Sequence, residues 1–160
     1  MVSGDIFFKW SPDYSVGIKT IDDQHLVLVN TLNRLSAAVS KHEGEKVITG
    51  IFDALMSYTR IHFALEERLL LQAKYKDIDA HMEEHRKLLR QLKQLYENHL
   101  REEKPVYNET MDFLKVWLIE HIQGVDTRYS AAVKQAGFSV SSWEREASAE
   151  FNRASKALSR

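Results

Sequence analysis

Cysteine is missing from this chain of 160 residues, and proline occurs only twice. Without a thiol the chain cannot form disulfides, iron-sulfur clusters or thiolate zinc sites, so any metal ion must be held by imidazole and carboxylate groups. Only six glycines accompany the two prolines, which disfavours a fold built from many short strands and turns. Together these scarcities predict an all-α protein.

An excess of charge of one sign and long apolar runs are also missing. The chain has 22 Lys and Arg against 23 Asp and Glu, so no large positive field is available to hold nucleic acid or an anionic membrane. The N-terminal residues MVSGDIFFKWSPDYS lack a basic stretch followed by an apolar segment, and no apolar run is long enough to span a membrane. We therefore expect a cytoplasmic protein with no nucleic-acid partner and no membrane partner.

Apolar residues recur at steps of three and four along four stretches, which predicts four long amphipathic helices. The first three stretches span residues 20–39, 48–69 and 78–99, and the fourth begins near Pro105 and ends near Gly137. Thr20 followed by Asp23 resembles a capping box at the start of the first helix. Short connections between long helices favour an antiparallel up-down four-helix bundle.

The predicted organisation is a bundle over residues 1–136, including an irregular arm over residues 1–19, and a C-terminal extension over residues 137–160. In the extension, one helical face is shared by Trp143, Ala147, Phe151, Ala154 and Leu158. We expect this segment to be a helix that covers part of the bundle. Binding of a protein partner, or self-association through residues 139–160, is the alternative.

Five of the seven histidines lie on the inward stripes of four different predicted helices: His25, His62, His81, His85 and His121. A single histidine on such a stripe is usually a hydrogen-bonded core residue, but burying five without a shared partner would cost several kcal/mol. In an antiparallel bundle all five belong to the same end. At 1.5 Å per residue, His42 and His99 lie roughly 25 Å and 21 Å further along their helices. We interpret these two as structural or solvated residues.

Two pairs of polar residues have the spacing of chelating ligands. His62 and Glu66 are four residues apart, as are His81 and His85, so each pair projects from one helical face and can reach a common ion or two adjacent ions. The alternative for Glu66 is a solvated carboxylate beside Glu67.

Asp126 lies five residues after His121, and on an ideal helix this offset turns it well away from the inward stripe. A local wide turn near Gly124 could aim it back. Its alternative role is an ion pair with a nearby cation such as Arg128.

The predicted set of ligands defines the kind of site. Five imidazoles, two carboxylates that each bridge two metals and one bridging oxygen leave a single open position on two six-coordinate ions. A demand for six ligands and two carboxylate bridges favours iron over tetrahedral zinc.

Four motifs occur in order along most of the chain: W-x3-YSVGI-x2-ID-x-QH from Trp10, HFALEE from His62, H-x3-H from His81, and WLIEHIQGVD ending at Asp126. With this pattern, from Trp10 to about Tyr129, the chain resembles the hemerythrins, and bacteriohemerythrins in particular. The motif that ends at Asp126 has the five-residue offset between ligands that the family shows.

The resemblance implies a centre of two iron ions with a bridging oxo or hydroxo group. One iron would be held by His81, His85 and His121, the other by His25 and His62, with Glu66 and Asp126 as bridges. The iron with two histidines would keep an open position at which dioxygen binds reversibly. Leu118 and Trp117 resemble the family's apolar oxygen-pocket residues, although ordinary core packing explains Trp117 equally well.

The expected function is therefore an oxygen carrier, store or delivery protein that is not an enzyme. A di-iron oxidase or peroxidase is one rival, but such bundles typically carry Glu-x-x-His pairs, and this chain has none. An oxygen or redox sensor, or an interaction module, is the other rival.

Overall fold

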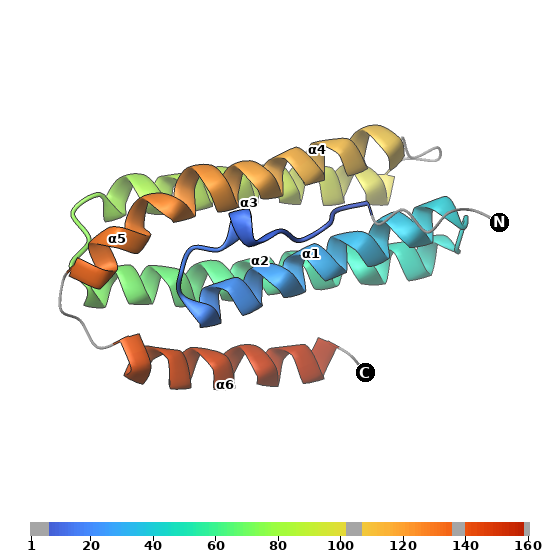
Figure 1. Ribbon diagram of the computed structural model, residues 1–160. Coiled ribbons are helices and arrows are strands. Elements are labelled where there is room, and N and C mark those ends of the chain that lie inside the picture. The colour runs from blue at the N-terminus through green and yellow to red at the C-terminus, as the bar shows by residue number, and fades with distance from the viewer. Residues whose placement is uncertain (1–6, 102–106, 136–139, 159–160) are drawn as a thin grey trace.

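The protein, described here from a computed structural model, is a bundle of four helical rods with a further helix packed on its outside (Figure 1). The structure describes residues 7–101, 107–135 and 140–158, without the side chains of residues 107–109, 124–128 and 158. Within these ranges there is no β-strand, and no helix combines the length and the apolar composition that crossing a membrane requires. The predicted all-α bundle with an N-terminal arm and an extra C-terminal helix is confirmed.

Three of the rods are single helices: α1 (Lys19–Ser40), α2 (Glu45–Gln72) and α3 (Ile78–Arg101). The fourth rod consists of α4 (Tyr107–Ile119), a π-helical segment η2 (Glu120–Asp126) and α5 (Thr127–Gln135). The predicted ranges of the first three agree with these bounds to within three residues. Pro105 and Gly137, which were expected to mark the ends of the fourth helix, lie outside the described residues.

The two described connections between rods have the same local geometry. His42 after α1 and Lys74 after α2 both adopt left-handed backbone conformations, with φ of 52° and 55°. In the first connection the amide of Glu43 donates to the carbonyl of Ala38, and in the second the amide of Tyr75 makes the equivalent bond. This is the Schellman arrangement, which satisfies the last carbonyls of a helix and reverses the chain. Tight reversals of this kind make consecutive rods antiparallel.

The predicted capping box at the start of α1 is wrong. Lys19 already begins the helix, and its N-cap residue, Ile18, makes no side-chain capping bond. Asp22 instead anchors the preceding turn, because its carboxylate accepts from the amide of Val16 at 2.9 Å. Thr20 is buried inside the first turn, where its hydroxyl donates at 2.7 Å to Glu144 of the C-terminal helix. A partner 124 residues away determines what Thr20 does, so local sequence could not reveal it.

The described part of the N-terminal arm, residues 7–18, lies along the bundle between α1 and α4 (Figure 1). Its main attachment is Asn33 of α1, whose amide oxygen accepts from the backbone N–H of Phe8 at 2.7 Å and whose amide nitrogen donates to the Phe8 carbonyl at 2.8 Å. The Phe8 side chain is buried in the core beneath this pair of bonds. One side chain therefore satisfies both backbone groups of a residue that belongs to no regular element.

The C-terminal helix α6 (Val140–Leu158) packs against α1 and α2 on the outside of the bundle (Figure 1). Its predicted apolar stripe contributes Trp143, Ala147 and Phe151 to the same apolar core that the four rods share. These side chains are therefore buried within the chain itself. The division into a bundle of residues 1–136 and an extension of residues 137–160 stays a prediction.

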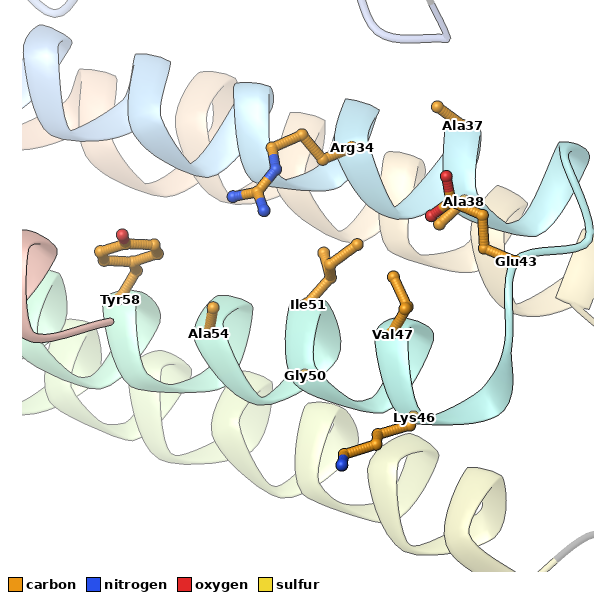
Figure 2. A pocket seen from close by; sticks show the side chains of 10 residues that line it. All are labelled: Arg34, Ala37, Ala38, Glu43, Lys46, Val47, Gly50, Ile51, Ala54 and Tyr58. Atoms are coloured by element: carbon orange, nitrogen blue, oxygen red, sulfur yellow. The ribbon is translucent and has the colours of Figure 1, made fainter. Parts of the chain in front are cut away.

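The groove between α1 and α2 remains open beyond the part that α6 covers. Phe151 of α6 stacks on Tyr58 of α2, with ring centroids 5.7 Å apart, and Tyr58 also begins the lining of the open part. Figure 2 shows this part, which has a floor of small residues such as Ala54 and Gly50 and the charged side chain of Arg34 above it. Small side chains leave the groove hollow where α6 no longer fills it.

We expect Asn33→Ala to lower the free energy of unfolding by about 1–3 kcal/mol, because both backbone groups of Phe8 lose their partner in a partly buried position. Urea unfolding followed by circular dichroism measures this change. Asn30→Ala, at an exposed position on the same helix, is the matched control and should change stability by less than about 0.5 kcal/mol. Equal effects of the two substitutions would contradict the role of Asn33.

Candidate metal centre

Six of the seven predicted metal ligands meet inside the bundle. α1 contributes His25, α2 contributes His62 and Glu66, α3 contributes His81 and His85, and η2 contributes His121. Each is at most 5% exposed to solvent. The first turns of α1 and α3, the last third of α2 and the second half of the fourth rod are therefore at one end of the molecule, as an antiparallel bundle requires.

The six residues form two groups that share one member. In the first group, ligand atoms of His25, His62, Glu66 and His121 all lie within 4.8 Å of one another. The second group consists of Glu66, His81 and His85, with the same spacing. Each group could hold a metal ion, and Glu66 belongs to both.

The carboxylate of Glu66 has the geometry of a bridge. Its Oε1 atom lies 2.5 Å from Nε2 of His81 and 3.0 Å from Nε2 of His85, both on α3. Its Oε2 atom faces the other way, 3.4 Å from Nε2 of His62, and accepts a hydrogen bond from the Tyr129 hydroxyl at 3.0 Å. The two oxygens of one carboxylate thus face two different groups of histidines. The alternative in which Glu66 is solvated is wrong, because this residue has no exposed surface.

Glu66 is a buried negative charge. Burial raises its pKa, but hydrogen bonds from His62, His81 and His85 more than compensate, and the pKa is held well below its ordinary value. The described partners of this carboxylate are three histidines and one tyrosine, with no lysine or arginine among them. An ionised carboxylate away from water requires a positive counter-charge, and a metal ion held by the surrounding imidazoles supplies one. The donor set therefore fits a cation.

Two residues outside the predicted ligand set orient the imidazoles. His62 donates from Nδ1 to the amide oxygen of Gln24 at 2.6 Å, and His85 donates from Nδ1 to the carboxylate of Glu67 at 2.8 Å. In both rings this leaves Nε2 directed at Glu66. Outer partners of this kind fix the tautomer and the orientation of a metal-binding histidine.

Sequence reasoning missed the roles of Gln24 and Glu67, although each is adjacent in sequence to a predicted ligand. On a helix, neighbouring residues point about 100° apart, so a residue next to a ligand reaches a different rod. Gln24 of α1 serves a histidine of α2, and Glu67 of α2 serves a histidine of α3. The only signal was adjacency, and it does not identify the partner.

Buried aromatic and apolar residues lie close to the histidines in space or in sequence. The ring of His85 lies parallel to that of Phe63, with centroids 3.8 Å apart. Leu118, one turn before His121, is fully buried, and Trp117 is buried with its indole donating to the Leu88 carbonyl at 3.2 Å. This bond accounts for Trp117 as a residue that packs α4 against α3. The oxygen-pocket role of Trp117 and Leu118 stays a prediction.

Asp126 is the last residue of the π-helical segment, and its side chain lies outside the described residues, as does that of Arg128. The wide turn that was expected near Gly124 is present, because η2 runs over Glu120–Asp126. In an α-helix a residue five positions after His121 would be rotated by roughly 140° from it. A π-helical turn contains more residues and brings position i+5 back toward position i.

His121 lies between the two groups. Its ring centroid is 5.3 Å from that of His85, 5.8 Å from that of His25 and 6.0 Å from that of His62. The resemblance assigns it to the same iron as His81 and His85, whereas its ligand atom is grouped with those of His25 and His62. The assignment of His121 to the iron of His81 and His85 stays a prediction.

The remaining two histidines are remote from this cluster, as predicted. His42 is exposed in the connection between α1 and α2. His99 is buried near the end of α3, where its Nε2 atom lies 2.8 Å from the Thr49 hydroxyl and its ring stacks on Phe52. His42 is therefore solvated and His99 is structural.

Comparison with known proteins adds an independent observation to this geometry. The family model described as the hemerythrin HHE cation binding domain matches residues 16–133. The chain belongs to this family. That range contains all seven predicted ligands and ends before α6 begins. The resemblance to hemerythrins inferred from the motifs is thereby confirmed.

Individual relatives agree with the family match. The chain is 30% identical over 125 residues to a bacteriohemerythrin of Stenotrophomonas maltophilia, covering 78% of this chain and 80% of that protein. It is 32% identical over 127 residues to a bacteriohemerythrin of Pseudomonas aeruginosa, covering 79% and 82% of the two chains. A crystal structure of wild-type hemerythrin superimposes with a TM-score of 0.71 at 29% identity, covering 79% of this chain and 97% of that one. The hemerythrin fold therefore accounts for about four-fifths of this chain.

We expect Glu67→Ala to weaken metal binding by about tenfold, because His85 loses the acceptor that orients its ring. Competition between the protein and a chelator for ferrous iron, under nitrogen, measures this change. Asp53→Ala removes an exposed carboxylate from the same helix and should leave the affinity unchanged. Identical affinities of the two variants would show that Glu67 does not support the site.

Proposed function

We propose that this chain binds two iron ions and uses one open iron position to bind dioxygen reversibly, as an oxygen carrier, store or delivery protein. The observation that carries the proposal is the position of Glu66, whose two carboxylate oxygens face two separate groups of buried histidines. A single ion would require only one of these groups. Membership of the hemerythrin family supports the choice of iron and of dioxygen.

In this proposal one iron is held by His81, His85 and His121, the other by His25 and His62, with Glu66, Asp126 and an oxo or hydroxo group as bridges. When bound, a pair of ferrous ions supplies the electrons and the vacant coordination position that dioxygen requires. The chain itself fixes the ligands, because Gln24 and Glu67 hold two of the imidazoles in the orientation and tautomer that leave Nε2 available.

The surroundings of the cluster favour the release of bound dioxygen over its chemical reaction. The six described ligands are almost inaccessible to solvent. Phe63, next to His62 on α2, is a buried apolar residue, and so are Trp117 and Leu118, which lie on α4 about one turn before His121. Keeping water and acids away suppresses the proton transfers that would commit bound oxygen to chemistry. The hydroxyl proton of Tyr129 is used in the hydrogen bond to Oε2 of Glu66. It is therefore not directed at bound oxygen. This arrangement supports binding without turnover, and we propose that the protein is not an enzyme.

A sensor is the second candidate function, and the position at which α6 packs favours it. This helix lies outside the family match and packs on the two helices that carry His25, His62 and Glu66. A change at the cluster could thus alter how α6 is held. Binding of a partner through residues 139–160 stays a prediction. Such a partner would have to use the outward face of α6 or displace the helix, because Trp143, Ala147 and Phe151 are buried against the bundle. The cytoplasmic location likewise stays a prediction.

Anaerobic reduction of the iron-loaded protein, exposure to air and renewed deoxygenation test the proposal directly. We expect two irons per chain and a visible absorption band that appears with oxygen and disappears without it. Iron quantification and absorption spectra over several cycles provide the measurement. Irreversible bleaching, or conversion of an added co-substrate, would favour the oxidase or peroxidase instead.

The role of Asp126 as the second bridge has its own test. Asp126→Asn should lower the iron content from two ions per chain to about one or fewer, because an amide is a poorer bridging ligand than a carboxylate. Asp112→Asn replaces an exposed aspartate on the same rod and should keep the full iron content. Metal analysis of both purified variants decides the matter, and two irons in the Asp126 variant would remove this residue from the ligand set.

A further inference from the structure

The C-terminal helix α6 is attached at the level of the metal cluster. It begins after the family match ends at residue 133, so it lies outside the matched hemerythrin domain. It packs on α1 and α2, the helices that carry three of the described ligands (Figure 1). Trp143 and Phe151, two of the residues that seat it, are 1% and 4% exposed. The contact is therefore as well buried as the core of the bundle.

Trp143 contacts the backbone of the segment that carries the ligands of α2. Its indole N–H donates to the carbonyl of Leu65 at 2.8 Å. This carbonyl belongs to the peptide that joins Leu65 to Glu66, and in a regular α-helix it also accepts the amide of Leu69. A carbonyl oxygen has two lone pairs and can accept both donors. The peptide plane immediately before Glu66 is thus held from outside the bundle.

Two polar bonds flank this contact. Thr20 of α1, five residues before His25, donates its buried hydroxyl to Glu144 at 2.7 Å. Arg68 of α2, two residues after Glu66, pairs with Glu150 at 3.0 Å. The Arg68 pair is partly exposed on both sides and contributes little by itself. The Thr20 bond is less accessible, because Thr20 is buried and Glu144 is half-buried. α6 is thereby bonded to both helices close to their ligands.

Packing alone does not account for Trp143. A helix that only covered apolar surface could use leucine or phenylalanine at this position, without the need to satisfy a buried indole N–H. The indole instead reaches a backbone oxygen that lies between His62 and Glu66 in sequence. Because ligand geometry depends on the surrounding shell, a donor at this peptide influences how Glu66 is presented.

We propose that α6 supports the metal centre and that Trp143 is its positioning residue, which holds the His62–Glu66 turn of α2 through the Leu65 carbonyl. The proposal rests on the proposed function, because the ions that the turn would hold are those of the iron pair. It gives the segment outside the family domain a specific task. α6 controls how tightly the iron pair is retained.

The test compares Trp143→Phe with Phe151→Leu in the full chain, loaded with ferrous iron under nitrogen. The first variant keeps an aromatic ring and loses the N–H donor; the second loses packing two turns further along the same helix. We expect Trp143→Phe to release iron to a chelator about tenfold faster than the parent and to shift the visible band of the air-oxidised form. Phe151→Leu should release iron at the parental rate, even if its thermal unfolding midpoint falls by as much as that of Trp143→Phe.

Two results would overturn the proposal. In the first, Trp143→Phe retains iron as long as the parent does and has the same spectrum. In the second, both variants lose iron faster in proportion to their loss of thermal stability, which is the behaviour of a helix that only packs.

Amide hydrogen exchange of the iron-free chain separates this proposal from the proposed function. We expect the amides of Glu66 and Leu69 to exchange faster in Trp143→Phe than in Phe151→Leu. Unchanged exchange would overturn the positioning role of Trp143. A parent chain that takes up no iron would overturn the proposed function and the iron-retention part of this inference. The exchange rates of the Glu66 and Leu69 amides would then decide whether Trp143 holds the His62–Glu66 turn.

Discussion

The burial of one carboxylate constrains the whole molecule. Glu66 has no exposed surface, and its charge is stabilised by histidines from α2 and α3 and by a tyrosine hydroxyl from α5. A buried ionised group is tolerated only if its partners are in place, so these helices must meet at this point with little freedom. The remaining described ligands, His25 and His121, complete the first group around it.

The rest of the structure keeps this arrangement rigid. Gln24 and Glu67 each cross from one rod to the next to hold an imidazole, which couples the orientation of a ligand to the packing of two helices. Phe63 stacks on His85 and restricts its ring. Trp143 and Thr20 attach α6 to the helices that bear the ligands. A buried polar network of this kind favours one packing, because another arrangement of the helices would separate hydrogen-bonded groups inside the core.

Sequence reasoning succeeded where the signal was periodic. The spacing of apolar residues located α1, α2 and α3, and the five inward histidines identified the end of the bundle at which the cluster lies. Sequence reasoning also predicted the wide turn that the structure shows as η2, because the five-residue offset between His121 and Asp126 does not fit an α-helix. The capping box predicted at Thr20 was wrong, because Thr20 has the sequence pattern of a helix cap but lies inside the first turn of α1. The supporting residues Gln24 and Glu67 could be noticed only because each is adjacent to a predicted ligand, and this adjacency did not identify their partners, which lie on other rods.

By itself the sequence determined that the protein is helical, which face of each helix is inward, and which side chains could bind a metal. These properties follow from the 3.6-residue period of the helix and from the chemistry of imidazole and carboxylate groups, both of which are local. Only the tertiary structure decided that Glu66 faces two groups of histidines, which residues orient the rings, and that α6 is bonded beside the cluster. These properties depend on rotations and contacts between rods that lie far apart in the chain, and no local pattern encodes such contacts.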